Sequence, residues 1–123
     1  MIWLAVGAGG ALGSMMRHAV NVAVTHWTGR PGPWSTFAVN MLGSFAIGLL
    51  AGLLASTRLT MTPTARVFVF VGILGGFTTF SSYMLDSFTL ASDGQRTAAL
   101  LNVAGQLMLG YALTMAGYRA GLV

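Results

Sequence analysis

The sequence contains no cysteine, lysine or glutamate, and charged side chains make up only 7% of its 123 residues. The absence of cysteine excludes a disulfide framework, a thiolate nucleophile and a cysteine-based metal site. Soluble domains carry about 25% charged residues, and a chain with so few cannot cover the surface that a water-soluble fold exposes. Hydrophobic residues make up 55% of the sequence, and we therefore expect an integral membrane protein.

The few charges are six arginines, spaced singly, together with Asp86 and Asp93. Isolated arginines do not form the basic runs that are typical of nucleic-acid-binding arms or lipid-binding patches, so we expect no nucleic-acid partner. A membrane span needs about 20 residues, so a chain of this length holds four spans at most. Four helices are few for enclosing a polar pathway, which favours an oligomer.

The apolar runs predict an all-α membrane protein with four spans in a single domain, residues 1–123. The N-terminal run lacks a basic segment and continues past the length of a signal peptide, so we interpret it as the first span. Residues 26–34 are rich in glycine and proline and cannot continue a helix; residues 56–63 form the second loop. The spans cover about residues 2–24, 34–55, 64–90 and 97–118.

The third span contains a run that weakens a helix in mid-membrane. Residues 72–83 read GILGGFTTFSSY, with two adjacent glycines followed by two threonines. This composition is typical of a broken transmembrane helix, because glycine loosens the helix and hydroxyl groups bind the freed backbone. We expect a break at residues 75–79, after which a half-helix continues to about residue 90.

The arginines divide almost evenly between the two expected sides of the membrane. The N-terminal side receives Arg58, Arg66 and Arg119, and the other side receives Arg30, Arg96 and, near the end of the first span, Arg17. An excess of basic residues in the loops of one side normally sets the orientation of a membrane protein. A chain without such an excess is expected to insert both ways, and two opposed copies could then form an antiparallel dual-topology homodimer.

Uncharged polar side chains gather near the expected break. Asn40 lies early in the second span, and a buried amide in hydrocarbon faces either a neighbouring helix or a water-filled cavity. Beyond the glycines, hydroxyl and aromatic side chains alternate: Phe77, Thr78, Thr79, Phe80, Ser81, Ser82 and Tyr83. Helix packing would explain one such residue alone. A group of neutral polar residues favours a binding site inside the membrane.

These residue types suit an ion that must be held loosely. Hydroxyl and amide donors, aromatic ring edges and the free amides of a resumed helix attract an anion, whereas carbonyls freed before the break can hold a small cation. A conducting pore needs binding that is sufficient but not tight. The residues therefore indicate an ion or small-solute pathway, with an anion ahead of a cation. Arg17 either snorkels to the membrane interface or draws anions to a vestibule.

Enzymatic and metal chemistry find little support in the sequence. His18 and His26 have no carboxylate or thiolate nearby, and no nucleophile motif accompanies any serine. We therefore expect no enzyme. The main alternative is a small proton-coupled multidrug-type exporter of four helices, which needs a membrane-embedded carboxylate, usually in the first span. The first span of this chain has none.

Three stretches resemble the Fluc, or CrcB-type, family of fluoride channels. They are GGALGSMMR at residues 9–17, STFAVNMLG at residues 35–43 and GILGGFTTFSSY at residues 72–83. The third stretch is the most specific. The chain length and the four-span layout also fit, so the resemblance covers essentially the whole chain.

The resemblance implies an antiparallel dual-topology homodimer with two pores, lined by both subunits, through which cytoplasmic fluoride leaves a bacterium passively across the inner membrane. It also implies a structural Na⁺ at the dimer centre, held by the backbone carbonyls of Gly75 and Thr78. The pore positions of the family match Asn40 as a hydrogen-bond donor, Phe80 as the first of two phenylalanines, Thr79 and Ser81 as hydroxyls beside the pathway, and Arg17 as the basic residue of the first helix.

The chain departs from the family at three places. Tyr83 stands where the family usually has a second pore phenylalanine, and its ring keeps the positive edge but adds a hydroxyl group. The fourth span has Gln106, Gly110 and Thr114 where the family tends to carry a serine-rich polar track. Residues 84–86 lack the usual small side chains before the acid, although the carboxylate itself is present.

Overall fold

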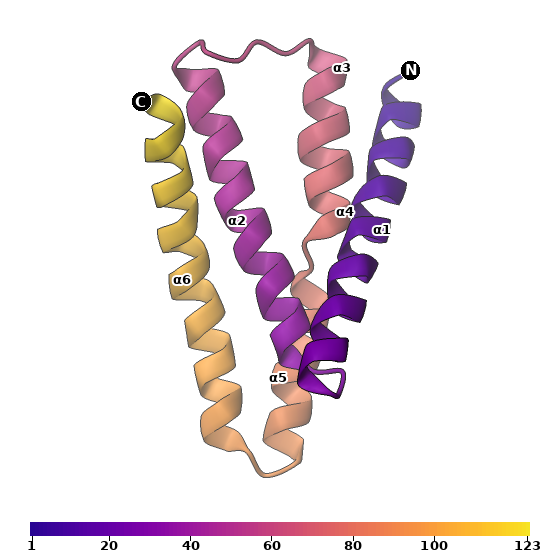
Figure 1. Cartoon of the computed structure of the whole chain (residues 1–123), viewed down its shortest axis with the longest axis vertical. Coiled ribbons are helices and arrows are strands. Elements are labelled where there is room, and N and C mark those ends of the chain that lie inside the picture. Colours follow the sequence, from indigo (N-terminus) through magenta and orange to yellow (C-terminus); the bar gives the residue numbers. More distant parts are fainter.

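Helices make up nearly the whole chain. The computed structural model describes residues 1–123. Three helices are uninterrupted, namely α1 (Ile2–Thr28), α2 (Pro33–Ala55) and α6 (Arg96–Leu122). Between α2 and α6 runs a helical segment in four parts: α3 (Pro63–Arg66), the π-helical η1 (Val67–Leu74), α4 (Gly75–Phe77) and α5 (Phe80–Ser92). Successive long segments run in opposite directions, so both termini lie at the same end of the molecule (Figure 1).

Three of the long segments are apolar enough to cross a membrane. These are Pro33–Ala55, Pro63–Ser92 and Arg96–Leu122. The 27 residues of α1 extend over about 40 Å at 1.5 Å per residue, which is also sufficient length, but α1 is not among these three spans. An all-helical chain with several potential membrane spans and a broken third segment is thereby confirmed.

Local signals set where these helices begin and end. α1 continues past the predicted end at residue 24, and it stops at Gly29, which adopts the left-handed conformation with φ of 73°. α2 starts with Pro33, which suits a first helical turn because proline lacks the amide hydrogen that would be unpaired there. α3 begins after Thr62, whose hydroxyl accepts a hydrogen bond from the backbone amide of Ala65.

Glycines join the helices into two closely packed pairs. In the first pair, α1 lies against η1 and α4, and a Cβ atom at Gly76 would lie 2.6 Å from the carbonyl oxygen of Gly10. In the second pair, α2 lies against α6, and a Cβ atom at Gly121 would lie 2.5 Å from the carbonyl oxygen of Leu49. Small residues let helix backbones approach closely in membranes, so these glycines serve helix packing at both pairs.

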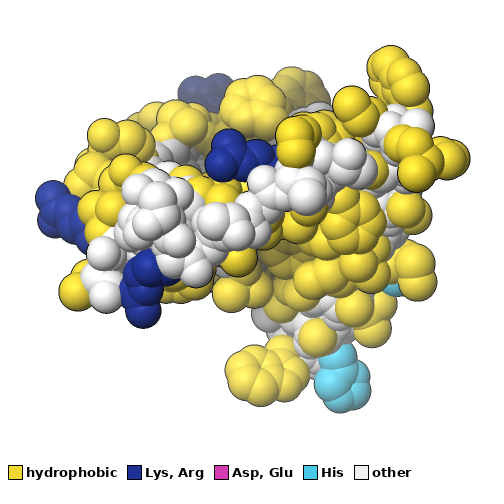
Figure 2. Space-filling view, turned by 90° about the horizontal axis from the view of Figure 1, so that it is seen from above, with side chains coloured by type: hydrophobic (Ala, Val, Ile, Leu, Met, Phe, Trp, Pro, Cys, Tyr) yellow, Lys and Arg dark blue, Asp and Glu magenta, His cyan; other side chains and the backbone are white.

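The two pairs diverge towards the end of the molecule that carries the termini, and α5 connects them near the other end (Figure 1). Seen from the end with the termini, hydrophobic side chains dominate the surface, the arginines lie apart from one another and no acidic side chain is visible (Figure 2). The helix flanks bear exposed Leu100, Leu101 and Met108. Such apolar flanks suit a lipid environment.

The break in the third segment is narrower than the sequence predicts. Only Thr78 (ψ of 162°) and Thr79 (φ of −152°, ψ of 125°) leave the helical conformation. Gly75 and Gly76 remain helical, although they lie in the predicted range 75–79. Gly76 instead serves the close contact with α1, so the helix is interrupted at the threonines that follow the glycines.

Candidate functional site

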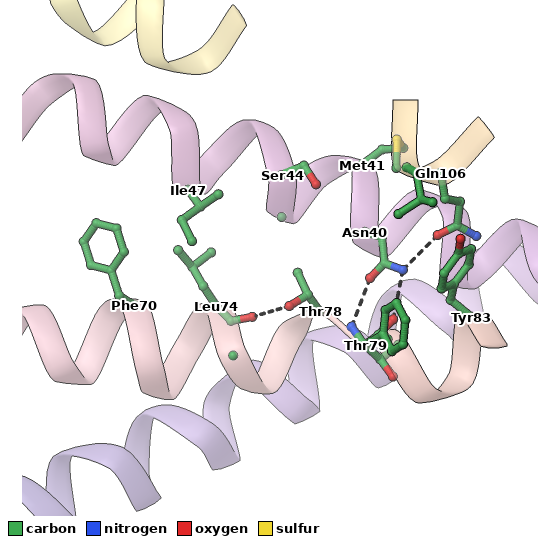
Figure 3. A pocket seen from close by; sticks show the side chains of 14 residues that line it. Asn40, Met41, Ser44, Ile47, Phe70, Leu74, Thr78, Thr79, Tyr83 and Gln106 are labelled. Carbon is green, nitrogen blue, oxygen red and sulfur yellow. Dashed lines mark hydrogen bonds between the residues drawn. The ribbon is translucent and has the colours of Figure 1, made fainter. Parts of the chain in front are cut away.

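A cavity of about 350 Å³ lies where α2, α6 and the broken third segment meet. Fourteen residues line this cavity, which we call the break pocket (Figure 3). Among them are six of the residues that the sequence singled out: Asn40, Gly75, Thr78, Thr79, Phe80 and Tyr83. The fold thus brings an amide from the second span beside the interrupted backbone of the third.

Asn40 binds the backbone at the centre of the break. Its amide nitrogen donates to the carbonyl oxygen of Thr79 at 3.0 Å, and its side-chain oxygen accepts from the amide of Thr79 at 3.0 Å (Figure 3). Two such bonds replace the partners that Thr79 loses when the helix stops. They satisfy backbone groups that would otherwise be unpaired inside a membrane.

The two threonine hydroxyls complete the ends of the interrupted helix. The Thr78 hydroxyl donates to the carbonyl oxygen of Leu74 at 3.0 Å, within the preceding turn. The Thr79 hydroxyl caps α5, since it accepts from the amide of Ser82 at 3.2 Å. The positive end of the α5 dipole therefore lies beside the break pocket, which favours negative charge there.

A chain of polar side chains continues from Asn40 into α6. The Asn40 amide nitrogen also donates to Gln106 Oε1 at 2.9 Å, and Gln106 Nε2 donates to Asn102 Oδ1 at 3.0 Å. Asn102 Nδ2 then donates to the Ser87 hydroxyl at 2.9 Å, and this hydroxyl donates to the carbonyl oxygen of Tyr83 at 2.8 Å. Gln106 is buried, and it lines the break pocket.

The sequence marks Asn102 and Gln106 as part of a possible polar stripe on the fourth span, but not as site residues, and it does not single out Ser87. The spacing of four between Asn102 and Gln106 was the available signal, since it places both on one face of a helix. The spacing alone does not show that this face of α6 meets Asn40. Ser44 of α2 also lines the break pocket, and nothing in its surroundings in the sequence singles it out.

The aromatic residues occupy different environments. The rings of Phe80 and Tyr83 lie 5.6 Å apart with planes inclined at 59°. Phe80 is 68% exposed, whereas Tyr83 is 3% exposed and its hydroxyl donates to the carbonyl oxygen of Val103 at 2.7 Å. The extra hydroxyl of Tyr83 is therefore bound to the α6 backbone.

Two of the predicted site residues do not line the break pocket. Ser81 is exposed on α5. Arg17 is half-buried on α1 and donates from Nη1 to the carbonyl oxygen of Thr78 at 3.3 Å. Arg17 thus reaches the break from the side of α1, while Asn40 reaches it from α2.

The backbone carbonyls before the break offer oxygen atoms to a small cation. The amide of Thr79, which would bond to the Gly75 carbonyl in a continuous helix, bonds to Asn40 instead. The Gly75 carbonyl therefore fits the oxygen-donor chemistry of a hard cation. The Thr78 carbonyl fits less well, because the positively charged Arg17 guanidinium lies against it and repels a cation.

A broken helix, with polar groups gathered at the break and several membrane-spanning helices around it, defines the class: a multi-span membrane protein with a site for a small solute or ion inside the membrane. Comparison with known proteins then identifies the family. The family model described as "CrcB-like protein, Camphor Resistance (CrcB)" matches residues 4–118. The chain belongs to this family.

Curated relatives share nearly the whole chain. A fluoride-specific ion channel FluC of Thermus thermophilus is 45% identical over 119 residues, which cover 97% of this chain and 94% of the relative. The proteins of the same name from Rhodospirillum centenum and Nitrobacter winogradskyi are 46% and 43% identical over 114 residues, covering 93% of this chain and 90% of each relative. These names are those of ion channels, in agreement with the expectation that the chain is not an enzyme.

Proposed function

We propose that the protein is a fluoride-selective ion channel that lets cytoplasmic fluoride leave the cell passively. One observation carries this proposal furthest: the Asn40 amide lies in a pocket at the interrupted backbone, beside the positive end of α5. The names of the curated relatives support the same function. The helices that are apolar enough to span a membrane and the bacterial relatives support a multi-pass protein of the inner membrane.

The chemistry of the break pocket suits a small anion. Fluoride loses its hydration shell when it enters a protein, and amide and hydroxyl donors can replace part of that shell. No lysine occurs in the chain, and Arg17 does not line the pocket, so no full positive charge traps the anion there. Phe80 adds the positive edge of its ring. In this proposal Asn40, Thr79, Phe80 and Tyr83 form the pore, Ser81 lies along its approach, and Arg17 attracts anions to the entrance.

The proposal includes an antiparallel dual-topology homodimer with two pores, each lined by both subunits. The exposed side chain of Phe80 supports this, because a pore wall formed by one chain alone leaves that ring uncovered. Reporter fusions at the C-terminus test the topology: opposed insertion gives signal from both compartments, and signal from one compartment contradicts it.

A structural Na⁺ at the dimer centre completes the proposal. The carbonyls of Gly75 and Thr78 would hold the ion, with the second lone pair of the Thr78 oxygen available while Arg17 donates to the first. When bound, Na⁺ supplies a fixed positive charge that ties the two interrupted helices together. Dimer stability measured in sodium and in N-methylglucamine buffers tests this: equal stability in both contradicts a structural Na⁺.

Liposome transport tests the proposed activity directly. Purified protein is reconstituted into potassium fluoride-loaded liposomes, valinomycin is added, and a fluoride electrode records efflux. We expect rapid efflux of fluoride without a pH gradient and far slower efflux of chloride. Efflux equal to that of empty liposomes contradicts a channel. Efflux that requires a pH gradient favours the alternative of a proton-coupled exporter.

A further inference from the structure

The hydrogen bonds of Asn40 leave it no free donor for an anion. An amide nitrogen carries two hydrogens. Asn40 gives one to the carbonyl oxygen of Thr79 and the other to Gln106 Oε1, at 3.0 and 2.9 Å. The side-chain oxygen of Asn40 accepts a hydrogen bond from the Thr79 amide. This bond determines which of the two terminal atoms is oxygen and which is nitrogen. One of the two acceptors must therefore move before Asn40 can bind fluoride.

Gln106 is the acceptor that can move. The Thr79 carbonyl belongs to the backbone. Asn40 holds Thr79 by two hydrogen bonds, one donated to its carbonyl oxygen and one accepted from its amide. Gln106 contributes only a side chain, whose amide can exchange the positions of its oxygen and nitrogen by turning about its last torsion angle. The turn places Nε2 where Oε1 was, so that an N–H group of Gln106 faces the N–H group of Asn40.

We propose that a fluoride ion in the break pocket binds to both the Asn40 and the Gln106 amides, and that Gln106, Asn102 and Ser87 form an amide relay which reverses direction when the ion enters. This inference rests on the proposed function and concerns the same pocket. In the arrangement described above, the relay donates away from the pocket, from Gln106 to Asn102 and from Asn102 to Ser87. In the reversed arrangement every one of these bonds points towards the pocket.

The reversal preserves the hydrogen bonds of the relay. Asn102 Nδ2 donates to Gln106 Oε1 instead of accepting at Oδ1, and the Ser87 hydroxyl donates to Asn102 Oδ1. The Ser87 hydroxyl gives up its bond to the carbonyl oxygen of Tyr83, but this oxygen keeps the bond from the helix backbone. No polar group that was paired is left without a partner except the two N–H groups that face the ion.

Those two N–H groups make the reversal dependent on the anion. Without an ion, the N–H groups of Asn40 and Gln106 repel each other, so the empty pocket favours the arrangement in which Gln106 accepts. With fluoride beside them in the pocket, both donate charge-assisted hydrogen bonds to the ion, which are stronger than the neutral bond they replace. Ion entry and relay reversal are therefore coupled, and Gln106 provides a donor for fluoride only while fluoride is present.

Side-chain amide resonances test the relay in the wild-type protein. The chain contains two glutamines, Gln95 and Gln106, so labelling with ¹⁵N at the glutamine side chain gives two amide signals. Gln95 is exposed between α5 and α6 and serves as an internal control. In nanodiscs we expect sodium fluoride to shift the Gln106 signal and leave that of Gln95 unchanged, with no such effect of sodium chloride. A Gln106 signal that responds equally to both salts contradicts the proposal.

Transport by two matched variants provides the second test. Asn102→Asp replaces the amide by a carboxylate that can only accept, so it holds Gln106 with Nε2 turned away from the pocket. Asn21→Asp makes the same chemical change on α1, outside the relay and the break pocket. We expect Asn102→Asp to raise the fluoride concentration for half-maximal efflux at least tenfold, and Asn21→Asp to change it less than about threefold. Equal values for the two variants contradict the relay.

The two proposals can fail separately. If wild-type liposomes do not release fluoride, the channel function itself is wrong. If they release fluoride, but Gln106 does not respond to the ion and Asn102→Asp behaves as Asn21→Asp does, only the relay is wrong. Gel filtration of each variant, with the wild-type elution volume as the criterion, restricts the comparison to folded protein.

Discussion

Replacing Asn40 by aspartate tests the centre of the break pocket. The substitution keeps the size of the side chain and exchanges the amide nitrogen for an oxygen. The carbonyl oxygen of Thr79 and Gln106 Oε1, which accept from that nitrogen at 3.0 and 2.9 Å, would then face another acceptor. The bond from the Thr79 amide to the remaining oxygen is preserved. The change therefore removes donors from the pocket without removing the side chain that binds the break.

The expected loss of transport is large. At about 4 Å and an effective dielectric constant of about 20, two negative charges repel by about 4 kcal/mol. Each 1.4 kcal/mol corresponds to about a tenfold change in an equilibrium constant, so the carboxylate lowers fluoride occupancy about a thousandfold. Fluoride-electrode recordings from liposomes at neutral pH measure the effect directly, and we expect efflux at least a hundredfold below that of the wild type.

A matched variant tests whether the loss of efflux depends on the position of the carboxylate in the break pocket or would follow from a carboxylate anywhere in the membrane. Asn21 lies in α1 and does not line the break pocket, so Asn21→Asp makes the same chemical change outside the proposed pathway. Rates are divided by the amount of protein that elutes at the wild-type volume. Wild-type efflux by the Asn40→Asp channel, or an equal loss in both variants, would refute the placement of Asn40 in the pathway.

Two further substitutions test packing and the role of one hydroxyl. A Cβ atom at Gly48 would lie 2.9 Å from the Thr114 carbonyl carbon, whereas nothing lies within 4 Å of one at Gly105. Thermal unfolding in detergent should therefore show a loss of about 1–3 kcal/mol for Gly48→Ala and none for Gly105→Ala; equal stabilities contradict the packing. Tyr83→Phe removes the bond to Val103, which costs about 0.5–1.5 kcal/mol, and efflux should persist; abolished efflux would place the hydroxyl in the pathway.

Much of the fold follows from local sequence. The apolar runs predict the long helical segments, and the turns at residues 26–34 and 56–63 separate them. The position of the break depends on more than composition. Gly75 and Gly76 weaken a helix in isolation, but Gly76 is required for contact with α1, and that contact keeps the segment helical. A tertiary contact thus moves the break to Thr78 and Thr79.

The candidate site is also only partly predictable, because its geometry depends on tertiary contacts as well as on local sequence. Asn40 and the segment after the glycines are conspicuous because polar side chains are scarce in the spans. The bond between Asn40 and Gln106 depends on the axial register of α2 against α6, which the glycine contacts at Gly48 and Gly117 determine. No local pattern encodes that register. The same applies to the bond between Arg17 and Thr78, which joins residues 61 positions apart.

The two extended residues at the break have a mechanical consequence. Backbone contacts at glycines hold each helix pair together, and Thr78 and Thr79 form a joint between the pairs that is braced by side-chain bonds from Asn40 and Arg17. Helices tilt when the thickness of the surrounding bilayer changes. Because the helix is interrupted at this joint, a tilt of one pair against the other would bend the chain there, and a change in bilayer thickness would then alter the break pocket.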